Sequence, residues 1–160
     1  MKRILKIIGI ALGVVFLGIQ VVRPNRDNPV IDSSTSLFAN ATVPPDVATL
    51  IRNACFDCHS DETRWPFYSN IAPVSWLVAS DVEQGRKHMN FSEWGTYAAK
   101  KRALKLDRLQ DQVTDGSMPL PKYLLMHPDA RLSDADRKKI ADWAEKEGQK
   151  YGDDASAGQK

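Results

Sequence analysis

The sequence of 160 residues contains only two cysteines and three histidines. A closed zinc site needs four such ligands at characteristic spacings, and the 39-residue separation of His88 from His127 matches no zinc finger. The cysteines are two residues apart, but no alternation of strand and helix surrounds them, as it does in thioredoxin-like enzymes. The shortage of ligands argues against structural zinc, and the lack of strands argues against a thioredoxin-like dithiol.

Alternating apolar and polar residues, which mark a half-buried strand, are also missing over any useful length. Between residues 44 and 150 the apolar spacing is helical, so the fold class predicted is all-α. Four helices are expected: Pro45 to about Phe56, Pro73 to about Gly85, Ser92 or Asn90 to Gly116, and Ser133, capped with Asp136, to Gly148. The first of them should cross the last, with Leu50 or Ile51 meeting Ile140 and Trp143.

Acidic residues are absent from the first 26 positions, which hold five of the 22 Lys and Arg residues. The rest of the chain therefore carries 17 basic against 20 acidic side chains. Nucleic-acid binding usually requires a strongly basic domain. We therefore expect no nucleic-acid partner.

Within residues 1–23, three basic residues precede an apolar run from Ile7 to Val22, and no small-x-small cleavage site follows the run. As a helix this run is about 24 Å long, slightly short of a hydrocarbon core of about 30 Å. We interpret residues 1–23 as an uncleaved signal anchor, a single transmembrane helix in a bacterial inner membrane. A cleaved secretory signal is the alternative.

Composition divides the rest of the chain into three parts. Residues 24–43 are rich in Pro, Asn, Ser and Thr and are expected to form a flexible linker. Residues 44–150 form the predicted domain, and residues 151–160 a disordered tail. Two long loops that contain prolines, Ser60–Pro73 and Asp115–Ser133, separate the predicted helices. Long ordered loops in compact domains are usually functional, so the chemistry is expected there.

The two cysteines belong to Cys55-Phe-Asp-Cys58-His59, which fits the C-x-x-C-H pattern of c-type haem attachment. Two thiols at this spacing can add to the two vinyl groups of a haem, and the adjacent imidazole can bind the iron. We predict one covalent haem c, with Cys55 and Cys58 as thioether links and His59 as the proximal iron ligand. A simple disulfide between the cysteines is the alternative.

Haem iron that transfers electrons normally has a second axial ligand. The candidates are the remaining methionines and histidines near the predicted loops: Met89, Met118, Met126, His88 and His127. Met118 follows Gly116, which permits a tight turn, and precedes Pro119, which fixes the backbone. We predict Met118 as the distal ligand, with His127 as its main rival.

Other side chains are expected to support the haem. The second ring nitrogen of His59 should donate to a backbone carbonyl, and carbonyls near Pro66 or Pro73 are the proposed partners. Three side chains are candidates for contact with a haem propionate: Arg64, Trp65 and Lys122.

The order of helix, C-x-x-C-H, long loop, further helices, Gly-x-Met-Pro loop and last helix resembles small class I cytochromes c. The block DETRWPFYSNIAPVSWLVASDVEQGRKHMNFSEW (Asp61–Trp94), together with DGSMPLPKY (Asp115–Tyr123), is similar to the bacterial haem-binding-domain family of membrane-anchored, cytochrome-c-like proteins. The resemblance implies a cytochrome c-like helical domain with long haem-wrapping loops. It also implies the ligand roles given above for Cys55, Cys58, His59 and Met118.

These features together predict a membrane-anchored c-type cytochrome that transfers single electrons to an unidentified redox protein and has no substrate of its own. Covalent haem attachment takes place outside the bacterial cytoplasm, so the domain should face the periplasm. Two alternatives stay open. One is a haem-based sensor or peroxidase-like enzyme with a labile distal ligand; the other is a module that docks a larger redox protein through the basic face at Lys100, Lys101 and Arg102.

Overall fold

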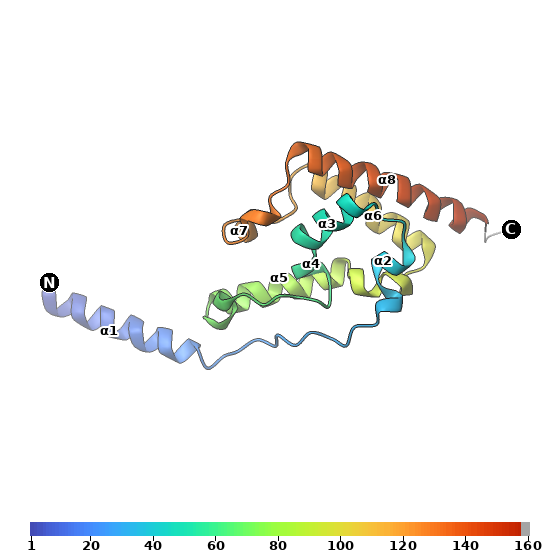
Figure 1. The fold of residues 1–160 in the computed structure, drawn as a ribbon. Coiled ribbons are helices and arrows are strands. Elements are labelled where there is room, and N and C mark those ends of the chain that lie inside the picture. Colours follow the sequence, from blue (N-terminus) through green and yellow to red (C-terminus); the bar gives the residue numbers. More distant parts are fainter. Residues whose placement is uncertain (158–160) are drawn as a thin grey trace.

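The computed structural model describes residues 1–157, which fold into helices without any strand (Figure 1). The α-helices in this range are α1 (Lys2–Ile19), α2 (Leu37–Asn40), α3 (Pro45–Ala54), α4 (Phe56–His59), α5 (Val74–His88), α6 (Ala99–Thr114), α7 (Pro121–Leu124) and α8 (Asp134–Ala157). Short 3-10 helices connect them: η1 (Ser33–Thr35), η2 (Phe67–Asn70), η3 (Phe91–Thr96) and η4 (Pro128–Ala130). The prediction of an all-α fold is confirmed.

The core lies between α6 and α8, which pack side by side (Figure 1). Leu106 of α6 and Ile140 of α8 are completely buried, and so is Trp94 of η3. Helix α3 packs on α8 as predicted, because Ile51 joins the same apolar cluster as Ile140. Helix α4 lies on the side of α3 that faces away from α8 (Figure 1).

The third expected helix is two elements. Asn90 begins η3, since its side chain accepts a hydrogen bond from the backbone N–H of Ser92. Ala98 then takes an extended backbone conformation, with ψ of 151°, and α6 starts only at Ala99. Tyr97, with ψ of 135°, is extended as well, and these two residues interrupt the helical hydrogen bonds, so the apolar pattern spans two helical segments.

Helix α8 begins as predicted but ends later. Ser133 and Asp136 form the expected capping box, with the backbone N–H of Asp136 donating to the Ser133 hydroxyl at 3.2 Å. The helix passes through Gly148, the expected stop, and continues to Ala157. Tyr151, expected in a disordered tail, is buried and donates its hydroxyl to the carbonyl of Asn40 at 2.7 Å. The last part of that expected tail, 158–160, lies outside the described residues.

Helix α5 packs on α4 at Gly85. A Cβ atom at this position would lie 2.4 Å from the carbonyl oxygen of Cys58, a separation that real Cβ atoms do not adopt. Glycine therefore allows the two backbones to touch. The sequence predicts that this helix ends near Gly85. Instead, Gly85 makes this contact from within α5, which continues to His88.

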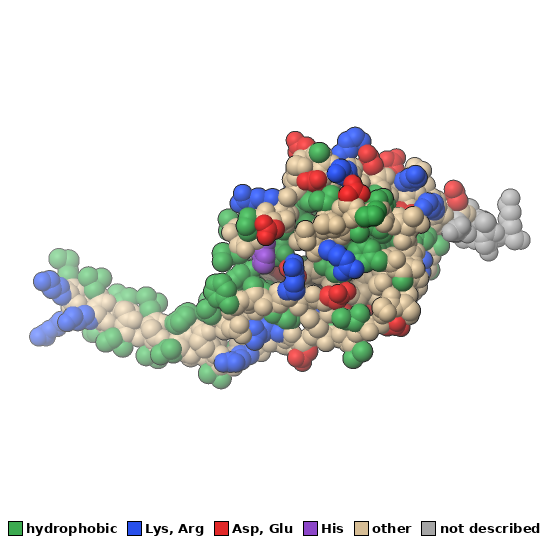
Figure 2. Space-filling model, in the orientation of Figure 1, with side chains coloured by type: hydrophobic (Ala, Val, Ile, Leu, Met, Phe, Trp, Pro, Cys, Tyr) green, Lys and Arg blue, Asp and Glu red, His purple; other side chains and the backbone are tan. Residues whose placement is uncertain are grey.

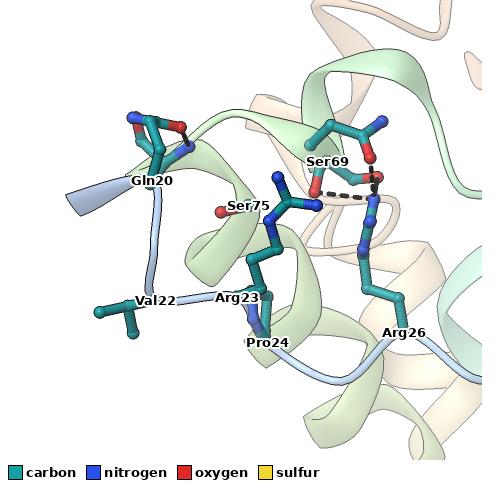
Figure 3. A pocket seen from close by; sticks show the side chains of 9 residues that line it. Gln20, Val22, Arg23, Pro24, Arg26, Ser69 and Ser75 are labelled. Atoms are coloured by element: carbon teal, nitrogen blue, oxygen red, sulfur yellow. Dashed lines mark hydrogen bonds between the residues drawn. The ribbon is translucent and has the colours of Figure 1, made fainter. Parts of the chain in front are cut away.

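The segment before the domain lies along the domain surface. Figure 3 shows Gln20 and Arg26 reaching the loop before α5: the Gln20 side-chain oxygen accepts from the N–H of Ala72 at 2.9 Å, and Arg26 donates to the carbonyl of Ser69 at 3.0 Å. Further along, Leu37 of α2 is completely buried. The expected flexible linker is thus attached to the domain at both of its ends.

Helix α1 ends at Ile19, before the end of the apolar run. Its apolar part, from Ile7 to Ile19, is about 20 Å long, whereas a hydrocarbon core is about 30 Å thick. The remaining residues of the helix include three basic side chains, which Figure 2 shows in blue at the N-terminal end of α1. Among the described residues, no helix is long and apolar enough to cross a membrane. The prediction of a transmembrane anchor over residues 1–23 is therefore wrong.

The contact at Gly85 predicts the effect of a single methyl group. Gly85→Ala should lower the free energy of unfolding by about 1–3 kcal/mol, because the added Cβ meets a backbone carbonyl that cannot rotate away. Urea unfolding followed by circular dichroism measures this change.

A second glycine supplies the control. At Gly148 an added Cβ would make only an ordinary contact, 3.5 Å from the Leu106 Cβ. Gly148→Ala should therefore raise the free energy of unfolding by about 0.5–1 kcal/mol, the usual gain of helix propensity. Equal effects of the two substitutions would show that the close approach of α5 to α4 is not tight in solution.

Candidate functional site

The C-x-x-C-H motif forms a single helical turn. Cys55 is the N-cap of α4, and its carbonyl accepts hydrogen bonds from the N–H groups of Cys58 at 3.2 Å and His59 at 2.9 Å. Both cysteines carry free, half-buried thiols. The turn therefore brings two thiols and one imidazole together, as the motif predicts.

An aromatic stack holds this turn in place. Phe56, inside the motif, is buried between the rings of Phe38 and Phe91, each with its centroid 5.5 Å away. The hydroxyl of Ser60 donates to the carbonyl of Phe56 at 2.7 Å and closes the end of the turn. Burial of the central ring fixes which side of the turn faces the core, and Cys55 packs against the same apolar cluster.

His59 is held by the backbone at the end of α5. Its Nδ1 lies 3.0 Å from the carbonyl oxygen of Met89. A carbonyl can only accept, so Nδ1 carries the hydrogen and Nε2 keeps a lone pair for a metal. Burial lowers the pKa of His59, which favours this neutral form. The prediction of a carbonyl partner is confirmed, but its expected place near Pro66 or Pro73 is wrong.

The two thiols are weak acids. Burial, with a smaller effect of Cys58, raises the pKa of Cys55 to about 12. Burial, followed by the negative charges of Asp81 and Asp57, raises the pKa of Cys58 to about 11. Redox-active dithiols need at least one thiol of low pKa. The surroundings of this motif are therefore unlike those of a redox dithiol.

Met118 is presented by a tight turn after α6. Gly116 has a φ of 80°, which glycine adopts without strain, so the predicted turn is confirmed. The N–H of Met118 donates to the carbonyl of Gln112 at 3.0 Å, and its own carbonyl accepts from Arg137 at 2.7 Å. The backbone at Met118 is thus fixed on both sides while its thioether stays half-buried.

The segment after Met118 lies against the motif. The hydroxyl of Tyr123, on α7, donates to the carboxylate of Asp57 at 2.8 Å, and Lys122 pairs with Asp81 of α5 at 2.8 Å. Lys122, a candidate for propionate binding, therefore has a carboxylate partner already. The fold brings the loop that carries Met118 to the turn that carries His59.

The other candidates for a distal ligand are engaged elsewhere or exposed. The Nε2 of His127 lies 2.7 Å from the hydroxyl of Tyr68, and its ring stacks on Tyr123 with centroids 4.1 Å apart. Met89 is buried beside His59, whereas Met126 is 54% exposed. These contacts favour Met118 over its rivals.

Arg64 and Trp65 lie directly after the motif. The guanidinium of Arg64 pairs with Asp57, Nε to Oδ1 at 3.0 Å, although its side chain is 70% exposed. The indole N–H of Trp65 donates to the side-chain oxygen of Asn28 at 3.3 Å. Their contact with a haem propionate stays a prediction, and each has a protein partner in this structure.

Sequence reasoning missed Asp57 and Tyr123. Asp57 lies inside the motif, yet it is only 7% exposed, which is rare for a carboxylate without partners. An acidic residue between Phe56 and Cys58, followed by Arg64, was the available signal. Nothing local pointed to Tyr123, which lies 66 positions away.

The side chains of this site fit a haem. The thiols are uncharged and free on one turn, and the imidazole has an available Nε2. A thioether lies on the loop that meets this turn. Cys55, Cys58, His59 and Met118 would hold the group.

The raised thiol pKa values predict slow alkylation of the haem-free protein. At pH 8 a thiol with a pKa of about 11 is about a thousandth ionised, against about a quarter for an ordinary thiol. Iodoacetamide should therefore react with Cys58, measured in Cys55→Ser, about 250-fold more slowly than with the urea-unfolded chain. The rate should rise with pH until about 11, whereas a plateau near pH 9 would contradict the burial argument.

Comparison with known proteins gives one assignment. Residues 14–146 match the family model of the haem-binding domain. A search of the curated proteins and a search of the solved structures each gave no match. Because the family match covers well over half of the chain, the protein belongs to the haem-binding domain family, and its cofactor is haem.

Proposed function

We propose that the protein is a periplasmic c-type cytochrome that carries one covalent haem c and exchanges single electrons with a redox protein. The observation that carries this proposal is the arrangement of α4. One turn holds two free thiols and a histidine whose Nδ1 is bonded to the Met89 carbonyl. This is the set of groups that covalent attachment and proximal ligation require.

Attachment uses the two thiols. Each S–H group would add across one vinyl group, with the sulfur bonding to one carbon and the hydrogen to the other, and this addition would need no oxidant. Cys55 and Cys58 lie on one turn and remain protonated at neutral pH, because burial raises the pKa of each. Since this chemistry takes place outside the bacterial cytoplasm, a periplasmic location belongs to the proposal.

His59 and Met118 would bind the haem iron. His59 would bind through Nε2, because Nδ1 is used by the Met89 carbonyl, and this bond also fixes the plane of the ring. Met118 would bind from the loop after α6. When bound, the haem iron supplies a group that can gain and lose one electron.

The fixed positions of His59 and Met118 suit electron transfer, because these residues need not move when the iron gains or loses an electron. The imidazole of His59 is fixed by one hydrogen bond to a backbone carbonyl. The backbone of Met118 is fixed by two hydrogen bonds: its N–H donates to the carbonyl of Gln112, and its carbonyl accepts from Arg137. The alternative of a peroxidase-like enzyme needs an acid–base group on the distal side. His127, a candidate for this group, is bonded to Tyr68 and stacked on Tyr123. These contacts favour an electron carrier over a peroxidase-like enzyme.

The central test is an optical spectrum of the protein produced with cytochrome c maturation factors. We expect a low-spin spectrum and a haem that survives acid-acetone extraction. Cys55→Ser and Cys58→Ser should each lower the yield of bound haem, because one thioether link is lost. A haem that is fully extracted from the unmodified chain would contradict the proposal.

A methionine pair tests the distal ligand. Met118→Ala should remove the sulfur-to-iron charge-transfer band of the ferric form and produce a high-spin or ligand-binding species. Met126→Ala is the matched control, because its side chain is 54% exposed and should not change the spectrum. An unchanged spectrum in Met118→Ala would transfer the distal role to another residue, with His127→Ala as the next variant.

A further inference from the structure

Asp57 is a buried carboxylate inside the haem motif, and both of its oxygens are bonded. Oδ1 accepts from Nε of Arg64 at 3.0 Å, and Oδ2 accepts from Nη2 of Arg64 at 3.2 Å. Oδ2 also accepts from the hydroxyl of Tyr123 at 2.8 Å. Such paired bonds to an ionised group are stronger than neutral ones and fix its orientation.

The partners of Asp57 come from the two long loops. Arg64 lies on the loop that follows the motif, and Tyr123 lies on α7, five residues after Met118. Asp57 therefore joins the turn of His59 to the segment that follows Met118. We refer to Asp57, Arg64 and Tyr123 as the Asp57 bridge.

Tyr123 is well suited to transmit this contact. Burial, followed by its bond to Asp57, raises the pKa of the hydroxyl, which stays protonated and donates. Its ring stacks on His127 at an interplanar angle of 14°, and His127 is bonded to Tyr68. The segment after Met118 is thus held near its middle by Asp57 and near its end by Tyr68.

We propose that Asp57 is a positioning residue for the distal ligand, because through Tyr123 it holds the segment after Met118 against the turn that carries the proximal histidine. This inference rests on the proposed function. It assigns the Asp57 bridge a role beyond stability: the motif residues would stay with the haem through their covalent links, whereas Met118 would stay at the iron only while its segment is held.

The test is displacement of the distal ligand by imidazole in the haem-loaded, full-length protein. Tyr123→Phe removes one hydroxyl and keeps the stacking on His127. A hydrogen bond to a charged, buried group contributes enough that its loss should raise the apparent affinity for imidazole about tenfold or more. Asp57→Asn removes the charge that accepts from the Tyr123 hydroxyl, so it should act in the same direction.

Asp81→Asn is the matched control. It removes the ion pair between Asp81 and Lys122, which is on the same short helix α7, but Lys122 is 43% exposed in that pair. Exposed ion pairs contribute little, so the affinity for imidazole should change less than about twofold. Amide hydrogen exchange of residues 119–127 should become faster in Tyr123→Phe and not in the control.

Two results would overturn the proposal in different ways. Wild-type affinity for imidazole in Tyr123→Phe and Asp57→Asn would mean that the Asp57 bridge only stabilises the fold. If the wild-type chain keeps no covalent haem, or shows no sulfur–iron band, the proposed function fails first, and the role of Asp57 fails with it. The first failure appears only in the variants and the second already in the unmodified protein.

Discussion

The close approach of α5 to α4 is the constraint on which the site depends. With glycine at position 85, α5 passes near enough for its C-terminal end to meet the ring of His59. The carbonyl of Met89 can then accept from Nδ1 of that ring, and Arg86 can donate to the carbonyl of Ser60 at 2.8 Å. A single residue without a side chain thus makes possible two hydrogen bonds that fix the histidine and the end of its turn.

The two sides of the site are held by different interactions. The motif turn rests on buried aromatic surface, with Phe56 between two other rings. The segment after Met118 has little apolar cover, since Leu125 is 77% exposed, and depends on polar contacts such as the one between Tyr123 and Asp57. Apolar burial stabilises without fixing direction, whereas hydrogen bonds fix both distance and direction. Directional contacts are therefore found on the segment that, in the proposed function, places a ligand without a covalent link.

The distance along the chain explains which features the sequence could predict. The capping box at Ser133 and the turn at Gly116 depend on atoms a few residues away, and both are found as predicted. The turn that carries the motif is equally local. The contact of His59 with a carbonyl 30 positions later comes from tertiary packing, which no pattern within the motif records. The candidate ligands could thus be named from sequence, whereas the groups that support them could not.

The polar segment before α3 also makes tertiary contacts that its sequence did not predict. Its composition is typical of a linker, but the side chain of Asn28 accepts from Nη2 of Arg86 at 2.8 Å and donates to the carbonyl of Thr63 at 2.9 Å. Because Arg86 also bonds to Ser60, this segment connects through one side chain to the turn that carries His59. Polar residues with partners in the fold are part of it, however weak their apolar periodicity. The family match begins at residue 14, so it includes this polar segment together with the helices that follow it.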